Sequence, residues 1–116
     1  MAAHMITTGT WMVDEAKEAA FLEAWATFAA SASESSGAAT LRLGRDSRDP
    51  RRFVSFAAWA TAEDVQAWKT SLEMQEGLAR VVQHVDEFDN TVLEVVITAS
   101  SGQSEIAVAS SLAKGA

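Results

Sequence analysis

The chain has 116 residues, of which 48% are hydrophobic, so it is long and apolar enough to fold as one domain around its own core. A formal net charge of -7 argues against nucleic acid and anionic membrane surfaces as partners. The absence of cysteine excludes disulfides, thiolate metal sites and cysteine nucleophiles.

The N-terminal residues bear on the location of the protein. Residues 1–4 resemble a cloning scar, so Met5 is the expected start of the native chain. The first residues lack the charged and apolar regions of a signal peptide, and no apolar run approaches the roughly 20 residues of a membrane span. We therefore expect a cytoplasmic protein that has no contact with a membrane.

A strand and a long helix are expected first. Residues 6–13 (ITTGTWMV) alternate and are rich in β-forming residues, which predicts a strand. Asp14 suits a helix N-cap, and apolar side chains then recur with helical spacing to about residue 33. This stripe includes Trp25, which we expect to pack on the sheet or to reach the edge of a cavity.

The next segments predict an antiparallel hairpin. Residues 38–46 and 52–60 alternate, and residues 46–51 (DSRDPR) are turn-forming and hold the only proline. A strand that is apolar on both faces must be covered on both. The chain's own helices would cover one face of the second strand, and a second copy of the chain would cover the other. The side chains of these two faces are Phe53, Ser55, Ala57 and Trp59 on one, and Val54, Phe56, Ala58 and Ala60 on the other.

Two separate helices are expected in the second half of the chain. Thr61 suits an N-cap, with Asp64 at the reciprocal position of a capping box. Ser71 suits a second N-cap, from which a longer helix is expected to reach about residue 87. Gly77 lies inside that helix and costs about 1 kcal/mol relative to alanine. It marks either a close approach by a neighbour or a glycine that the helix merely tolerates.

Residues 91–98 (TVLEVVIT) predict the last strand. The resulting order, β-α-β-β-α-β, is that of an α+β ferredoxin-like sandwich, in which a four-stranded antiparallel sheet carries helices on one face. We expect this domain to cover residues 5–98. Residues 99–116 are expected to form a flexible tail, or to dock residues 106–108 on a partner.

The second face of the sheet requires a cover of its own. Val54 and Phe56 are expected there, together with one alternating set of apolar residues from the last strand. A monomer would then expose an apolar patch larger than soluble monomers usually carry. The pattern therefore predicts a homodimer that forms through the sheet face.

An aromatic pocket is the main candidate site. Ser55 and Trp59 share one face of a strand, Trp68 comes from the following helix, and Trp11 comes from the first strand. Such a cavity would bind flat aromatic molecules, and its hydroxyl and indole N–H donors would stabilise an oxyanion. The alternative is that the tryptophans serve only as packing.

The basic segment and the histidines are weaker candidates for a functional site. Residues 42–52 hold five arginines and two aspartates, which is typical of a solvated hairpin tip. Alternatively, Arg42 faces the pocket and pairs with an anionic or phenolate ligand. His84 has no partner at metal-ligand spacing, so no metal site is expected, and no glycine-rich loop supports a nucleotide or flavin.

The chain resembles the antibiotic biosynthesis monooxygenase domain, within the dimeric α/β barrel superfamily. The resemblance rests on a basic Asp-Pro turn at residues 49–50, the pattern F-V-x-F-x-x-W at residues 53–59, an acidic helix start, and A-W-x-x-S at residues 67–71. It implies a dimer with a barrel-like core and a pocket between sheet and helices. Some members of the family oxidise aromatic polyketides or quinols with O₂ and without a metal or flavin.

This chain departs from the family's better-equipped members. Ser55 stands where polyketide oxygenases carry an asparagine, and Val65 lies about where they carry a tyrosine. The haem-degrading branch matches at Trp68, but its iron-ligating histidine falls at Gly77 or Leu78 here.

The resemblance implies a cofactor-independent monooxygenase that acts on a small aromatic or quinol-like molecule. Trp59 and Ser55 would be catalytic, and Trp68, Arg42, Trp11 and Trp25 would bind the substrate. One alternative is a dimeric protein that binds a small apolar ligand without turnover. Another, less favoured, is a haem protein.

Overall fold

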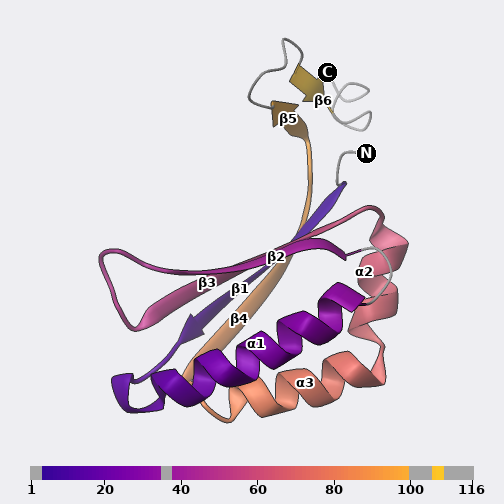
Figure 1. Ribbon diagram of the computed structural model, residues 1–116. Coiled ribbons are helices and arrows are strands. Elements are labelled where there is room, and N and C mark those ends of the chain that lie inside the picture. Colours follow the sequence, from indigo (N-terminus) through magenta and orange to yellow (C-terminus); the bar gives the residue numbers. More distant parts are fainter. Residues whose placement is uncertain (1–3, 35–37, 100–105, 109–116) are drawn as a thin grey trace.

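The computed structural model describes residues 4–34, 38–99 and 106–108 (Figure 1). The main sheet is made of β1 (Met5–Met12), β2 (Ala38–Arg45), β3 (Arg52–Trp59) and β4 (Glu87–Glu94). The helices are α1 (Glu18–Glu34), α2 (Ala62–Lys69) and α3 (Leu72–Val82), and one turn of 3-10 helix (Glu15–Lys17) precedes α1. No helix in these described ranges is long and apolar enough to cross a membrane.

The four strands lie in the order β2-β3-β1-β4, and every neighbouring pair is antiparallel. This order, with a helical crossover after β1 and another after β3, is that of the ferredoxin-like sandwich. The predicted α+β fold is therefore confirmed. Figure 1 shows α1 and α3 side by side against one face of the sheet, with α2 at one end of it.

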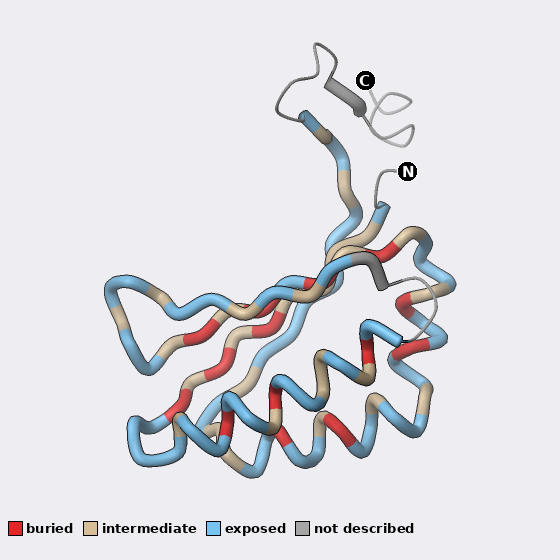
Figure 2. The backbone as a smooth tube through the Cα atoms, viewed as in Figure 1, coloured by how far each residue is buried: buried red, intermediate tan, exposed pale blue. Residues whose placement is uncertain are grey.

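The core lies between the sheet and the helices. Phe21 of α1 is fully buried and packs against Phe53 of β3, with ring centroids 5.1 Å apart. Trp11 of β1 stacks on Phe88 of β4 at 4.2 Å. Buried residues concentrate on β1, β3 and the helices, whereas β4 is mostly exposed (Figure 2). The helices thus cover the sheet unevenly and leave the β4 edge open.

Side-chain caps begin the helices where the sequence predicts them. The hydroxyl oxygen of Thr61 accepts a hydrogen bond from the backbone N–H of Asp64 at 3.1 Å. That of Ser71 accepts one from the backbone N–H of Met74 at 3.1 Å, and the hydroxyl donates to the Trp68 carbonyl at 2.7 Å. Ser71 therefore closes α2 and opens α3, which confirms the predicted break between these helices.

The end of α3 and the start of β4 differ from the sequence prediction. The helix ends at Val82 rather than near residue 87, and β4 begins at Glu87 rather than at Thr91. The backbone N–H of Asp86 donates to the Met12 carbonyl at 2.7 Å, and pairing with β1 continues from there. Pairing with β1 thus makes a strand of a segment whose acidic and polar residues are poor strand formers.

The chain continues beyond the main sheet as a second, smaller ribbon. β5 (Ile97–Ala99) pairs antiparallel with β6 (Ile106–Val108), and Figure 1 shows this ribbon projecting past the end of the sheet. Residue 99 and residues 106–108 of the expected tail are therefore paired as strands, and residues 97–98 belong to β5 rather than to the last strand of the main sheet. The rest of the expected tail, and residues 1–3 of the suspected scar, lie outside the described residues.

Ion pairs occupy much of the basic segment. Arg52 binds Asp46 at 3.0 Å, Arg45 binds Glu18 at 2.7 Å, and Arg51 binds Asp86 at 3.3 Å. Asp86 also accepts a hydrogen bond from Lys17 at 3.1 Å, and this bond holds the pKa of Asp86 below its ordinary value. These pairs are partly exposed and join the hairpin to its surroundings, as expected for a solvated turn.

Candidate functional site

A cavity of about 80 Å³ lies between the helix-facing side of the sheet and the helices. Most of the site residues predicted from the sequence line it together: Ser55, Trp11, Trp25, Trp59 and Trp68. Strand alternation explains the contribution of β3, since Ser55 and Trp59 point to the same face as the buried Phe53. The predicted aromatic pocket therefore exists within a single chain.

The floor of the cavity is a hydrogen-bonded unit centred on Ser55. The indole Nε1–H of Trp11 donates to the Ser55 hydroxyl oxygen at 2.9 Å. The Ser55 hydroxyl makes only a long contact, 3.5 Å, with the carbonyl oxygen of Gly9, which lies opposite it on β1. The hydroxyl hydrogen is thus weakly engaged and is the more available for a bound ligand.

Gly9 makes this unit possible by having no side chain. A Cβ atom at this position would lie 2.8 Å from the Ser55 hydroxyl oxygen and 2.9 Å from the Trp11 indole nitrogen. Both distances are shorter than ordinary side-chain contacts allow. The glycine therefore lets the Trp11 ring cross over β1 to reach Ser55.

Trp59 and Trp68 form an aromatic wall near α2. The Nε1–H of Trp59 donates to the Thr7 hydroxyl oxygen at 3.0 Å, which fixes the orientation of the indole. The ring of Trp68 lies 6.3 Å from that of Trp59 and 5.8 Å from that of Phe28 of α1, centroid to centroid. These are distances at which aromatic rings attract one another, and the wall offers flat apolar surface to a ligand.

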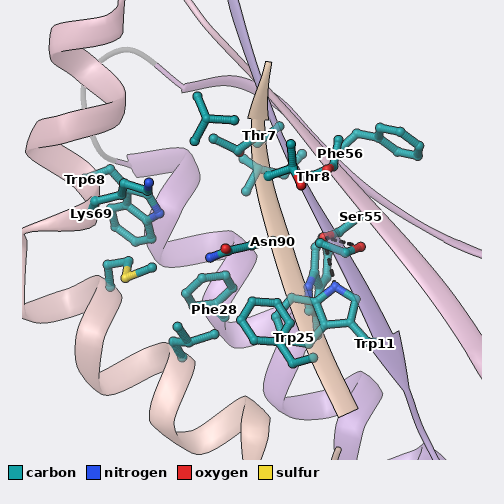
Figure 3. Close-up of a pocket in the computed structure, with 18 of the residues that line it drawn as sticks. Thr7, Thr8, Trp11, Trp25, Phe28, Ser55, Phe56, Trp68, Lys69 and Asn90 are labelled. Carbon is teal, nitrogen blue, oxygen red and sulfur yellow. Dashed lines mark hydrogen bonds between the residues drawn. The ribbon is translucent and has the colours of Figure 1, made fainter.

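Trp25 differs from Trp11 and Trp59 in the hydrogen bonding of its indole N–H. Its side chain is buried, yet its Nε1–H has no hydrogen-bond partner among the residues that the structure describes. Figure 3 shows Trp25 next to Trp11 at the lower end of the cavity. One of the residues that line the cavity therefore carries a buried donor that the protein itself leaves unused.

Arg42 does not reach the cavity. It is exposed and lies opposite Phe56 in the register of β2 and β3, on the sheet face that the helices do not cover. The expectation that Arg42 faces the pocket is therefore wrong, because alternation along β2 turns Leu41 and Leu43 to the helices instead. Lys69, at the end of α2, is the positively charged residue that lines the cavity.

Several lining residues were not predicted from the sequence. Thr7 and Gly9 share the parity of Trp11 along β1, so alternation alone could have identified them. Asn90 was missed because the last strand was expected to begin one residue after it. Asn90 projects toward Phe28 in Figure 3, and it is exposed, as is Lys69. These two exposed polar residues therefore mark where the cavity opens to solvent, Asn90 on β4 and Lys69 at the end of α2.

Among the residues that the structure describes, Lys69 is the ionisable group that lines the cavity. Its lining residues in the described part of the chain include no histidine and no carboxylate, and no group of three such residues there could hold a metal ion. His84 lies instead at a surface groove between α1 and α3. Of the positions compared with the haem-degrading branch, Leu78 lines the cavity with an apolar side chain, and Gly77 packs on Phe28.

Comparison with known proteins assigns the family. The profile of the family described as antibiotic biosynthesis monooxygenase matches residues 5–80, from β1 into α3. The chain belongs to the antibiotic biosynthesis monooxygenase family. The match covers every residue that carried the resemblance in the sequence. A search of curated proteins finds no match.

Solved structures of other proteins share the fold of this monooxygenase family member. SnoaB from Streptomyces nogalater, a cofactor-independent oxygenase crystallised as a mutant, is 15% identical, covers 90% of this chain and 100% of its own, and has a TM-score of 0.73. A Nitrosomonas europaea protein named for the same family is 23% identical over 82% of this chain and 93% of its own, with a TM-score of 0.71. A conserved protein from Methanosarcina mazei Go1 is 11% identical over 80% and 93%, with a TM-score of 0.74. At these identities the similarity establishes the fold alone.

Proposed function

We propose that this family member is a cofactor-independent monooxygenase that oxidises a small aromatic or quinol-like molecule with O₂. The observation that carries the proposal is the cavity itself, in which tryptophan faces surround hydrogen-bond donors from Ser55 and Trp25. An electron-rich ring stacks on such faces, and the donors stabilise negative charge on its oxygen. SnoaB, which shares the fold, is itself a cofactor-independent oxygenase.

The reaction needs little from the protein beyond binding and charge stabilisation. The substrate anion supplies the electrons that reduce O₂. One oxygen atom replaces two hydrogens at a ring CH₂ as a carbonyl, and the other leaves with those hydrogens as water. The buried walls exclude bulk water, and the donors hold the substrate oxygen while its negative charge develops.

Deprotonation of the substrate has no evident catalyst in the cavity. None of its described lining residues is a histidine or a carboxylate. We therefore propose that the substrate ionises by itself and that the donors favour the bound anion. Lys69, which also lines the cavity, adds a positive charge that favours the bound anion. The rate of oxidation should accordingly rise with pH through the pKa of the substrate, rather than through that of a protein group.

The test is O₂ consumption with anthrone, which has a ring CH₂ and forms an anion readily. Ser55→Ala removes a donor and leaves the Trp11 N–H without its acceptor, so the rate should fall by about 10²-fold. Ser47→Ala in the β2–β3 turn is the matched control and should keep the full rate. If the wild-type protein consumes no more O₂ than buffer does, the monooxygenase proposal fails.

Binding without turnover is the second candidate function. The lack of a general base among the described lining residues favours it, because binding needs no proton transfer. Saturable binding of anthrone without O₂ consumption would support this candidate.

We also propose that the protein works as a homodimer formed through the open face of the sheet. Phe56 of β3 is 49% exposed and Leu93 of β4 is 45% exposed, and both lie on the face opposite the helices. Isolated β-sheets bury such faces against another layer. A second copy of the chain would supply that layer.

A further inference from the structure

We propose that Trp25 is the residue that recognises an acceptor oxygen of the ligand, through its indole N–H. A carbonyl or phenolate oxygen is the chemical group that it would bind. The inference deepens the proposed function and rests on it for the expectation of an aromatic ligand. The donor itself is identified by its burial and by its lack of a hydrogen-bond partner, and neither observation depends on a reaction.

The first argument is the unused bond. Trp25 is only 8% exposed, and its Nε1 is the one buried side-chain nitrogen or oxygen without a hydrogen-bond partner among the residues that the structure describes. Most buried polar side-chain atoms are satisfied, because an unsatisfied donor loses its bond to water and gains nothing in exchange. Trp11 and Trp59, in the same cavity, both have partners, Ser55 and Thr7. Among the described residues, Trp25 is therefore the tryptophan whose indole nitrogen is both buried and without a partner.

The second argument is the position of the donor. Trp25 reaches the cavity from α1, on the side opposite the strand residues Ser55 and Asn90. In Figure 3 its ring lies beside Trp11, and Asn90 projects into the space above it. Trp25, Ser55 and Asn90 thus all line the cavity, and the weakly engaged Ser55 hydroxyl and the Asn90 amide are further donors beside the indole of Trp25.

The chemistry of the donor limits the ligand. An indole N–H donates and does not accept, so its partner must be a carbonyl, phenolate or similar oxygen rather than an ammonium or amide N–H. The surrounding faces belong to Trp68, Phe28 and other apolar residues, which suit a flat ring. An apolar cavity of about 150 Å³ holds benzene. A cavity of about 80 Å³ admits the oxygen-bearing edge of a ring, and the remainder would extend through the mouth at β4.

The test compares 1-indanone with indane, two ligands of nearly the same shape that differ in one carbonyl oxygen. Dissociation constants are measured by isothermal titration calorimetry on the full chain. The wild-type protein should prefer 1-indanone by about tenfold, the value of one buried hydrogen bond. Trp25→Phe keeps a flat ring but removes the N–H, and it should abolish this preference.

Trp59→Phe is the matched variant for stability, because it removes an indole N–H that already has a protein partner. Ser47→Ala, in the turn between β2 and β3 and outside the cavity lining, is the control for binding and should keep the preference for 1-indanone. In thermal unfolding without ligand, Trp25→Phe should lower Tm less than Trp59→Phe does, since only the latter breaks a hydrogen bond. A preference that survives in Trp25→Phe would overturn the proposal, as would a larger loss of Tm in Trp25→Phe or a failure of both ligands to bind the wild-type protein.

These outcomes are separate from those of the monooxygenase test. A protein that consumes no O₂ with anthrone, yet loses its preference for 1-indanone in Trp25→Phe, would contradict the proposed reaction and support the role of Trp25. The reverse result would contradict the role of Trp25 alone.

Discussion

Single residues determine the floor of the candidate site. Gly9, Trp11 and Ser55 form one unit in which a missing side chain on β1 lets an indole reach a hydroxyl on β3. The hydroxyl accepts from Trp11 and keeps its own hydrogen weakly engaged. The chemistry that we propose for Ser55 therefore depends on a neighbouring glycine as much as on the serine.

Gly9→Ala tests this dependence. The new Cβ would lie 2.8 Å from the Ser55 hydroxyl oxygen, so the serine and the Trp11 indole would have to separate. We expect a loss of about 1–3 kcal/mol in the free energy of unfolding, measured with urea. The near-ultraviolet circular dichroism of the tryptophans should change as well.

Gly44→Ala is the control for this substitution. Gly44 also lies in a strand, but a Cβ there would have its nearest neighbour, the Val54 carbonyl oxygen, at 3.9 Å. The free energy of unfolding should change by no more than about 0.5 kcal/mol. Equal effects of the two substitutions would mean that the loss at Gly9 reflects glycine in strands generally rather than the contact with Ser55 and Trp11.

At the scale of elements, the contact between α1 and α3 controls one wall of the cavity. A Cβ at Gly77 of α3 would lie 2.7 Å from the ring of Phe28 of α1, so the glycine marks a close approach by a neighbour. Phe28 in turn lines both the cavity and the surface groove between the two helices. The distance between α1 and α3 therefore sets the position of the Phe28 ring in the wall of the cavity.

A double-mutant cycle at Gly77 and Phe28 tests this contact. Alanine in a helix is favoured over glycine by about 1 kcal/mol, but the close Phe28 ring opposes the substitution. We expect Gly77→Ala to destabilise the wild-type protein and to stabilise the Phe28→Leu variant, as measured by urea unfolding. The same change in both backgrounds would show that the two residues are not coupled.

At the scale of the whole molecule, helices cover only one of the two faces of the sheet. Helices cover the face that bears Ser55 and Trp59, while Phe56 on the other face stays exposed. The cavity and the proposed dimer surface therefore lie on opposite sides of the same strand.

The proposed dimer is tested by Phe56→Glu. Light scattering at micromolar concentration should give the wild-type protein about twice the chain mass of 12.4 kDa. A charge at position 56 would be buried between the two copies, so the variant should have the mass of one chain. A wild-type mass near one chain would refute the dimer.

Leu72→Glu is the control for the dimer test. Leu72 is an apolar residue that is 65% exposed. Because it belongs to α3, it lies in the helix layer rather than on the open face of the sheet. It introduces the same charge, and the mass should remain that of the wild-type protein. A loss of mass in this variant would mean that the added charge, rather than its place on the sheet, causes dissociation.

Local patterns in the sequence determined much of this protein. Alternation along residues 52–60 predicted which side chains share a face, and the hydroxyls of Thr61 and Ser71 predicted where helices begin. Both signals act between residues close in sequence, where chain geometry fixes the distances. For that reason the element order, and the gathering of Ser55, Trp59 and Trp68, could be predicted without a structure.

Tertiary structure decided what depends on contacts between distant segments. β4 begins at Glu87 because β1 pairs with it. The unused N–H of Trp25 is likewise a property of everything packed around it. Periodicity in one segment carries no information about the register of another, since register is set by hydrogen bonds and packing across the sheet. The sequence alone therefore determined the fold and the aromatic part of the candidate cavity, and only the folded chain revealed its unsatisfied donor.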